Sequence, residues 1–241
     1  NDNCNLGGNC GFYHSKNAKR PNKSIKIIML VIVMIFVIAI AIVLTKPHWL
    51  SSSHRSKAQS VVTIKTDNQP TLGAKDAPLQ IISFEDFKCM NCRLFDLQIL
   101  PWIVQNYVDT KQANYTAITV SFLPDSMQAA VAARCIYQQK PSQFFVFSDL
   151  LFKKQGDEMT NWANTAKLLE WANQIKGIDQ EQFTKCLFNP DTVQQIIKNT
   201  QYGMTIMGGS LSTPALYING VLVRPLTKKH IQEVIHSLGK T

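Results

Sequence analysis

The chain has 241 residues, 45% of them hydrophobic, which is enough to bury an ample core in one or two domains. The formal net charge is +9, but residues 1–60 hold eight Lys and Arg against the single acid Asp2, whereas the remainder holds 17 basic and 15 acidic residues. The basic character therefore belongs to the N-terminal segment. A nucleic-acid-binding domain needs a basic face of its own, so we exclude that class of function.

Residues 1–24 form a polar, Asn- and Gly-rich tail that ends in a basic cluster, and we interpret it as a cytoplasmic tail that does not fold alone. Cys4 and Cys10 lie in this tail at a spacing that matches no metal-ligand pattern. We interpret them as reduced thiols, with lipid attachment or metal binding as the alternatives. The chain starts at Asn1 and not at Met, so we expect an N-terminus that is trimmed or incompletely recorded.

A transmembrane anchor is predicted at residues 25–45. Residues 27–44 are 18 consecutive apolar residues. Such a helix spans ~27 Å, close to the ~30 Å hydrocarbon core, and exceeds the ~7–15 apolar residues of a cleavable signal peptide. Five Lys and Arg precede the run and three follow it, which predicts a cytoplasmic N-terminus and an exported domain. Residues 46–60 are Ser-rich and polar, typical of a linker.

The exported part begins with strands and one helix. Residues 61–65 predict an edge strand, residues 71–78 a loop, and the short β-branched run 79–84 a buried strand. Apolar residues recur at helical spacing from Met90, and Pro101 should kink or end that helix. Residues 113–122 alternate in polarity and predict a second strand.

A Cys-x-x-Cys motif, Cys89 to Cys92, lies between the strand at 79–84 and the helix that starts near Met90. Unpaired backbone N–H groups and the helix dipole stabilise an anion there, so a thiol pKa of ~8.5 can fall to ~3.5–7.5. We therefore predict a nucleophilic thiolate at Cys89 and a resolving thiol at Cys92. Lys88 and Arg93 either lower the Cys89 pKa further or are solvated surface charges.

The rest of the chain is predicted to be mostly helical. Apolar residues have helical spacing over 126–139, 143–154, 163–176, 179–188 and 190–202. Residues 215–219 and 221–224, joined at Asn219-Gly220, predict a hairpin with a type I′ turn, and residues 227–238 a last helix. This order predicts an α/β thioredoxin fold, residues 61–125 and 203–241, with a helical domain inserted at residues 126–202.

The sequence resembles the DsbA-like branch of thioredoxin-fold disulfide oxidoreductases. The likeness covers residues 71 to about 240, and it includes GAKDAPLQIISFEDFKCMNCRLFDLQILPWIVQNYVDT, AARCIYQQKPSQFFVFSDLLF, QEQFTKCL and STPALYINGVLVRPLT. The resemblance implies a redox-active disulfide between Cys89 and Cys92, with no metal and no organic cofactor. It also implies that Thr213-Pro214 is the cis-proline loop, which presents backbone groups to the substrate.

The resemblance further implies a structural disulfide between Cys135 and Cys186, because relatives often have cysteines at these places and an exported domain favours oxidation. The alternative is a zinc site built from these two residues with Cys89 and Cys92. Zinc sites usually need a second close pair of ligands, and Cys135 and Cys186 are isolated from each other in the sequence.

The function implied by the resemblance is that of a membrane-anchored protein thiol:disulfide oxidoreductase of the bacterial inner membrane. It would introduce disulfides into exported, cysteine-containing proteins of the periplasm and be reoxidised by a quinone-linked membrane protein. Two alternatives stay open. One is a reductase or isomerase of the same fold, and the other is a non-catalytic binding module of an envelope assembly.

The sequence departs from the family in two places that affect the redox potential. Met90 and Asn91 replace the proline and the histidine or aromatic residue common between the cysteines, and Ser83 stands where many relatives have a buried acid. Glu85 and Asp86 are nearby, but we assign neither to that acid, on the expectation that their direction or depth differs from that of position 83. Potentials in the fold run from roughly −270 to about −120 mV, so the direction of electron flow is left open.

Overall fold

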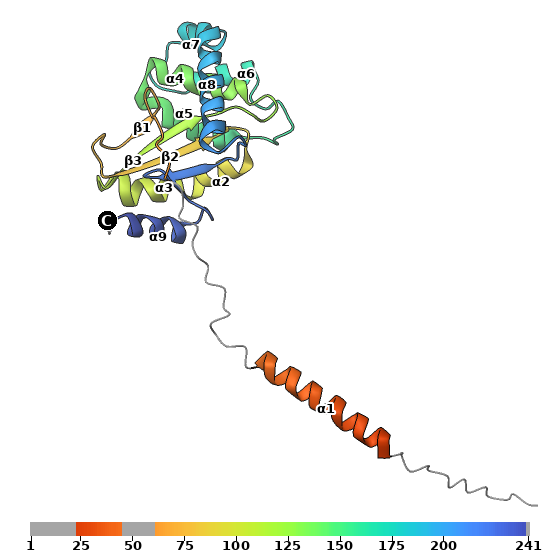
Figure 1. Cartoon of the computed structure of the whole chain (residues 1–241). Helices are drawn as coiled ribbons and strands as arrows, with labels where there is room; N and C mark the ends of the chain where they lie inside the picture. Colours follow the sequence, from red (N-terminus) through yellow and green to blue (C-terminus); the bar gives the residue numbers. More distant parts are fainter. Residues whose placement is uncertain (1–22, 45–60, 240–241) are drawn as a thin grey trace, which may run out of the picture. The chain divides into compact units, whose positions relative to one another are not determined.

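The computed structural model describes residues 23–44 and 61–239 (Figure 1), so Cys4, Cys10 and the linker lie outside the described residues. The chain divides into two units, residues 1–57 and 58–241. In the first, α1 (Lys23–Leu44) contains a stretch, Lys23–Ala41, with a mean hydropathy of 3.0. This helix is long and apolar enough to be a candidate membrane span.

The second unit is built on a five-stranded mixed sheet with the strand order β1-β3-β2-β4-β5. The strands are β1 (Thr71–Leu72), β2 (Leu79–Glu85), β3 (Ala113–Thr119), β4 (Ala215–Ile218) and β5 (Val221–Leu222). β2 and β3 are parallel, with Ile81 opposite Tyr115, and the other pairs are antiparallel. β3 is buried along its whole length and β2 from Ile81 to Glu85, so successive side chains on both faces of these strands are enclosed.

Three helical segments follow β2 and one follows β5, and the last of them, α9, lies below the sheet in Figure 1. They are α2 (Met90–Gln98), α3 (Leu100–Ile103), the π-helical turn η2 (Val104–Val108) and α9 (Lys228–Leu238). Pro101 acts as predicted, because α2 ends at Gln98 and Pro101 lies in the first turn of α3. α9 starts after Thr227, whose side chain accepts a hydrogen bond from the His230 N–H.

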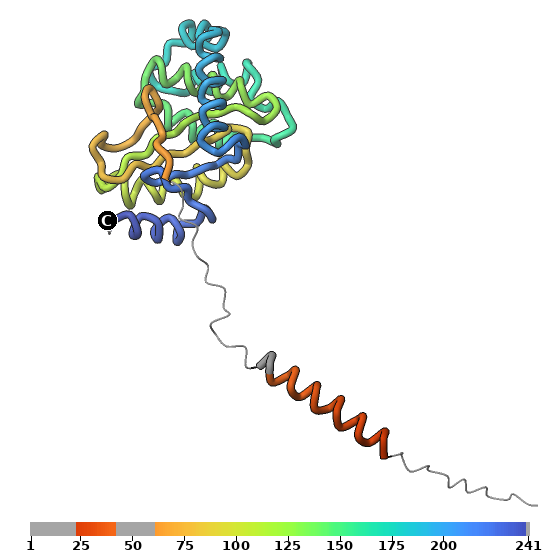
Figure 2. The backbone as a smooth tube through the Cα atoms, in the orientation of Figure 1, coloured from red at the N-terminus to blue at the C-terminus, as the bar shows by residue number. Residues whose placement is uncertain are grey.

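A group of helices follows β3, and Figure 2 shows the chain leaving the sheet through green and cyan helices and returning in blue. These are α4 (Met127–Gln139), the 3-10 turn η3 (Pro141–Gln143), α5 (Phe144–Lys154), α6 (Thr165–Ala172), α7 (Gln180–Leu187) and α8 (Pro190–Ile206). The five α-helices expected from apolar spacing are present, but α6 is shorter than expected and α8 runs on to Ile206. Asn189 caps α8 by accepting from the Asp191 N–H, and Pro190 takes its first position.

The edge of the sheet corrects the sequence prediction. Residues 61–65, predicted to be an edge strand, do not form a strand. The edge strand is instead Thr71–Leu72, at the start of the predicted loop 71–78, and it pairs with Thr116 and Tyr115. In residues 61–65, the Val62 N–H donates to the Gly220 carbonyl oxygen at 3.0 Å and the Lys65 N–H to the Tyr202 hydroxyl at 2.6 Å. One of these partners is a turn and the other a side chain, so no ladder forms.

The predicted hairpin is present as β4 and β5. Asn219 and Gly220 have φ angles of 46° and 80°, the left-handed pair that a type I′ turn requires. A Cβ atom at position 220 would strike the Val62 carbonyl oxygen, so glycine is needed there for space as well as for backbone conformation.

Candidate active site

Cys89 is the N-cap residue of α2, with φ −71° and ψ 120°, as the sequence predicted for a cysteine at a helix N-terminus. Its N–H donates to the Asp86 carbonyl oxygen at 3.0 Å, closing a tight turn between β2 and the helix. Cys89 is 8% exposed and Cys92 is fully buried one turn further on, and both are free thiols. One sulfur is therefore accessible from outside and the other is covered.

Asp86 holds this turn in place. One oxygen of its buried carboxylate accepts from the Lys88 N–H at 2.9 Å, and the other accepts from the N–H groups of Phe122 and Leu123 at 3.0 and 3.2 Å. The turn that carries Cys89 is thus tied to the segment that follows β3. We assign Asp86 a structural role.

The second part of the sheet brings Thr213-Pro214 to the cysteines. β4 follows Pro214 and pairs with β2, so the loop before β4 lies beside the start of α2. The Cys89 Sγ lies 3.4 Å from the Thr213 carbonyl oxygen, across 124 positions of sequence. The Thr213-Pro214 peptide bond is cis. The two candidate positioning residues and the two cysteines therefore form one site.

The two thiols are shifted in opposite directions. The pKa of Cys89 is lowered from 9.0 to about 6, mainly by a hydrogen bond from Cys92 and further by Thr213 and the N–H groups of Cys92 and Asn91, against the opposing effect of burial. The pKa of Cys92 is raised well above its usual value, first by burial, then by its bond to Cys89 and by the Glu85 charge. One thiol is thus mostly ionised at neutral pH while the other stays protonated, the division of roles that thiol–disulfide exchange needs.

Glu85 is a buried acid close to the position where many relatives have one, which is Ser83 here. The expectation that the Glu85 side chain differs from position 83 in direction or depth is wrong. Glu85 is two residues beyond Ser83 on the same strand, so both side chains point to the same face. Its carboxylate accepts hydrogen bonds from the hydroxyls of Ser83 and Tyr115 and is buried. Burial raises the pKa of Glu85, and its charge in turn raises the pKa of Cys92.

A second buried acid, Asp96, lies on the inner face of α2. Its pKa is raised to about 8, chiefly by burial and then by the charges of Glu85 and Asp149. The interior behind Cys92 therefore holds two carboxyl groups that bind protons more tightly than usual.

For Lys88, the structure contradicts the alternative of a solvated surface charge. Lys88 is 1% exposed, and its ammonium group donates to the Thr160 carbonyl oxygen at 2.9 Å, so it is not a solvated surface charge. Arg93 is half-buried on α2.

A groove of about 430 Å³ opens beside the reactive thiol. It is lined by both sides of the site, including Asn91, Leu94, Phe95, Thr213, Pro214 and Arg224. A larger cavity of about 730 Å³ is lined mainly by polar residues around the start of the domain, such as Asp67, Asn68 and Gln69, and shares no lining residue with the groove, whose walls at Asn91 and Thr213 adjoin Cys89. The smaller groove is the one that a protein substrate approaching Cys89 can occupy.

Cys135 and Cys186 are joined by a disulfide, with an Sγ–Sγ distance of 2.03 Å, between α4 and α7. This bond takes up two of the four cysteines that the zinc alternative required, so that alternative is wrong. Among residues 23–44 and 61–239 there is no cluster of three or more His, Cys, Asp or Glu side chains suited to a metal ion.

Comparison with known proteins shows the family to which the chain belongs. A family model described as thioredoxin matches residues 65–237. The probable disulfide bond formation protein D of Bacillus cereus is 30% identical over 159 residues, which cover 65% of this chain and 73% of that protein. The disulfide bond formation protein D of Bacillus subtilis is 27% identical over 157 residues, covering 65% and 70%.

Two solved structures share the fold. The oxidised BdbD of Bacillus subtilis superimposes with a TM-score of 0.70 at 25% identity, covering 76% of this chain and 99% of BdbD. The DsbA of Chlamydia trachomatis gives a TM-score of 0.68 at 28% identity, covering 75% and 96%. The chain therefore belongs to the thioredoxin family and is a DsbA-like thiol:disulfide oxidoreductase.

Proposed function

We propose that this oxidoreductase works as a membrane-anchored oxidase that introduces disulfides into exported proteins. The observation that supports this direction is the Cys89 thiol, whose pKa is lowered to about 6. A thiol of low pKa is a good leaving group in disulfide exchange, and stabilising its thiolate stabilises the reduced enzyme. Both effects favour transfer of the disulfide from the enzyme to a client.

The proposed exchange has two steps. A client thiolate attacks the Cys89 sulfur of the oxidised pair, the Cys89–Cys92 bond breaks, and Cys92 leaves and takes up a proton. A second client thiolate then attacks the client sulfur of the mixed disulfide, and Cys89 leaves as a thiolate. The client loses two electrons and gains a disulfide, and the enzyme pair is reduced. Buried Glu85 is placed to give a proton to Cys92, and to accept one when the direction is reversed.

Thr213 and Pro214 are proposed to hold the client. The cis bond before Pro214 leaves this loop beside the Cys89 sulfur, and both residues line the 430 Å³ groove. An extended client segment lying in the groove can pair with the backbone of this loop. These residues position the client and do not react.

After each turnover the pair must pass its two electrons on. We propose that the acceptor is a quinone-linked membrane protein and that α1 anchors the chain in the bacterial inner membrane, with the N-terminus in the cytoplasm and the catalytic domain in the periplasm. The 18 apolar residues at 27–44 and the excess of Lys and Arg before them support this orientation. Protease added outside intact cells with a permeabilised outer layer should digest the domain and spare the tail, and digestion of the tail alone would contradict the orientation.

The experiment that tests the exchange mechanism uses Cys92→Ser, which cannot resolve a mixed disulfide. Expressed in full length, this variant should accumulate disulfide-linked client species that disappear on reduction. Cys89→Ser is the matched control and should trap none. If Cys92→Ser traps nothing and wild-type Cys89 is unreactive, the chain is a binding module and not an exchange enzyme.

The direction of electron flow is tested by the redox potential of the Cys89–Cys92 pair. An oxidase should lie near the oxidising end of the range for this fold, about −120 mV, and a reductase near roughly −270 mV. A value at the reducing end would replace the oxidase by the reductase or isomerase alternative, while leaving the exchange chemistry unchanged.

A further inference from the structure

A segment between α5 and α6, residues 155–160, is tied to the turn that carries Cys89, and we call it the active-site strap. The Gln155 side-chain amide donates to the carbonyl oxygens of Phe87 and Cys89 at 2.7 and 3.1 Å. Buried Lys88 donates to the Thr160 carbonyl oxygen at 2.9 Å. The strap is therefore bound to the turn near both of its ends.

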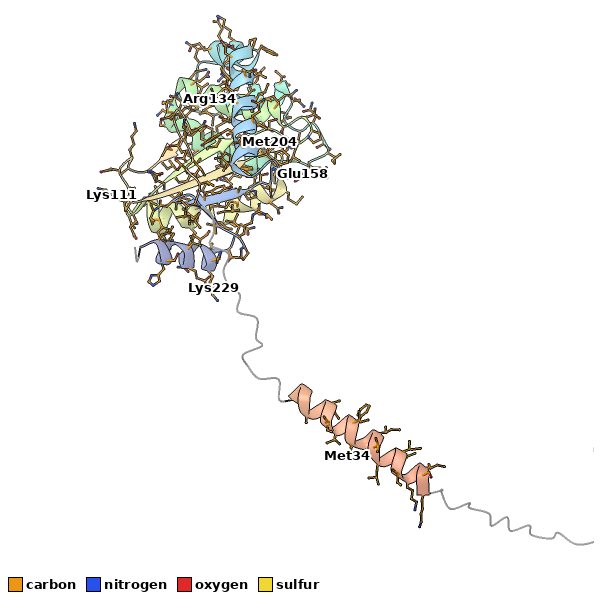
Figure 3. All side chains as sticks on the ribbon, in the orientation of Figure 1. Met34, Lys111, Arg134, Glu158, Met204 and Lys229 are labelled. Carbon is orange, nitrogen blue, oxygen red and sulfur yellow. A yellow bond between two sulfur atoms is a disulfide. The ribbon has the colours of Figure 1, made fainter. Side chains whose placement is uncertain are left out.

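Between these ends, Glu158 reaches the start of the helix itself. Its Oε1 accepts a hydrogen bond from the Met90 N–H at 2.6 Å, and Figure 3 shows Glu158 on the side of the domain where α2 lies. Asp157 shapes the strap for this contact, because its carboxylate accepts from the Met159 N–H at 2.8 Å and its carbonyl oxygen from the Thr160 N–H at 3.0 Å. Glu158 itself is half-buried.

Two anionic groups therefore share one helix terminus. The first N–H of α2, that of Met90, is taken by Glu158, and the next two, those of Asn91 and Cys92, face the Cys89 sulfur. A helix terminus behaves as a partial positive charge of about +0.5, and it stabilises a nearby anion less when a second anion already occupies it.

We propose that Glu158 is a positioning residue that weakens the stabilisation of the Cys89 thiolate by α2 and so lowers the oxidising strength of the Cys89–Cys92 pair. The inference rests on the proposed role of Cys89 as the reactive thiol. The two residues between the cysteines, Met90 and Asn91, carry no charge of their own. In this chain the tuning charge comes from a distant segment.

The charged and titratable groups near Cys89 belong to β2, the turn before α2, α2 itself, the active-site strap and the segment after β5. They are Glu85, Lys88, Cys92, Arg93, Glu158 and Arg224. The carboxylates of Asp86 and Asp157 are taken up by backbone N–H groups of their own turns. Of the acids, Glu158 is the one hydrogen-bonded to the backbone of α2 at its start. Its removal therefore changes the field at the helix terminus without opening the buried cluster behind Cys92.

The test is the pH dependence of Cys89 alkylation by iodoacetamide in the reduced full-length protein. Glu158→Gln keeps a hydrogen-bond acceptor and removes the charge, and Glu158→Ala removes both. Each should lower the midpoint by roughly 0.2–0.7 pH units, the range expected for one charge at a helix terminus. The equilibrium constant with glutathione should shift about two- to fivefold towards the reduced enzyme.

Glu181→Gln is the matched control, because Glu181 is an exposed acid of α7 paired with Lys185 and far from the strap in sequence. It should leave both readouts unchanged. An unchanged or raised midpoint in Glu158→Gln would overturn the proposal, as would a fall in Glu158→Ala alone, which would show that the contact acts through the bond and not the charge. An unreactive wild-type Cys89 would instead refute the proposed function, so the two failures are distinguishable.

Discussion

Removing the hydrogen bond from Cys92 to Cys89 should make Cys89 a weaker acid. The pKa of Cys89 is lowered from 9.0 to about 6, and the bond from Cys92 is the largest cause. A fall of about three pH units corresponds to about 4 kcal/mol of thiolate stabilisation, which solvent at the open side of the groove reduces to about 2–4 kcal/mol. With a pKa of about 6, roughly nine-tenths of Cys89 is ionised at pH 7, against a few per cent for a free thiol of pKa ~8.5.

The assay is the rate of iodoacetamide alkylation between pH 4 and 9, with the modified cysteine identified by mass spectrometry. Wild type should have a midpoint at about 6. Cys92→Ser keeps a donor and should stay close to this value, whereas Cys92→Ala should move the midpoint up by about one pH unit, the effect of one charge-assisted hydrogen bond. A wild-type midpoint near that of a free thiol, or equal midpoints in the Ser and Ala variants, would refute this account of the site.

The same shift predicts how the stability of the reduced protein depends on pH. Because the Cys89 pKa is lower in the folded chain than in the unfolded chain, the thiolate stabilises the fold fully above about pH 9. This contribution is lost as the pH falls through about 6. In urea titrations, reduced wild type should therefore gain stability from pH 6 to 9 relative to Cys89→Ser, and parallel curves would contradict the shift.

Three further changes test the interior of the domain. Glu85→Gln should slow resolution of a trapped mixed disulfide by roughly ten- to a hundredfold in quenched-flow experiments, because the amide cannot exchange a proton with Cys92; an unchanged rate would show that Asp96 or solvent does so. Asp96 has its pKa raised to about 8, so it stabilises the fold at low pH, and this contribution is lost as the pH rises through 8. Asp96→Asn should remove a slope of up to ~1.4 kcal/mol per pH unit between about pH 4 and 8 in urea titrations, and retention of the wild-type slope would count against the shift. Replacing Cys135 and Cys186 by Ala should cost about 4 kcal/mol of unfolding free energy, since the bond closes a loop of 51 positions, while the alkylation midpoint of Cys89 stays the same.

Sequence patterns predicted those parts of the fold in which residues close in the chain determine the structure. The β2 strand, the helix behind Cys89 and the hairpin at Asn219-Gly220 are where apolar spacing and turn chemistry placed them. The edge strand was misplaced, because residues 61–65 and 71–72 are both short and only their partners in the sheet decide which one forms a ladder. Those partners lie far away in sequence.

The site was predictable to the same extent. Cys89 and Cys92 were evident from their spacing, and Thr213-Pro214 from the resemblance. Glu85 could have been identified, because strand alternation puts it on the same face as Ser83. The strap could not, since its bonds to the turn join residues 66 to 72 positions apart.

The strand arrangement has a consequence for the chain while it is being synthesised. β4 pairs with β2 but follows it by more than a hundred residues, with all of α4 to α8 between them. A chain that emerges from its N-terminus therefore presents Cys89, Cys92 and then Cys135 before either Cys186 or the loop at Thr213 has appeared. During that interval three thiols can pair wrongly with one another. The Cys135–Cys186 bond therefore has to form in a chain whose reactive cysteines, Cys89 and Cys92, have already emerged.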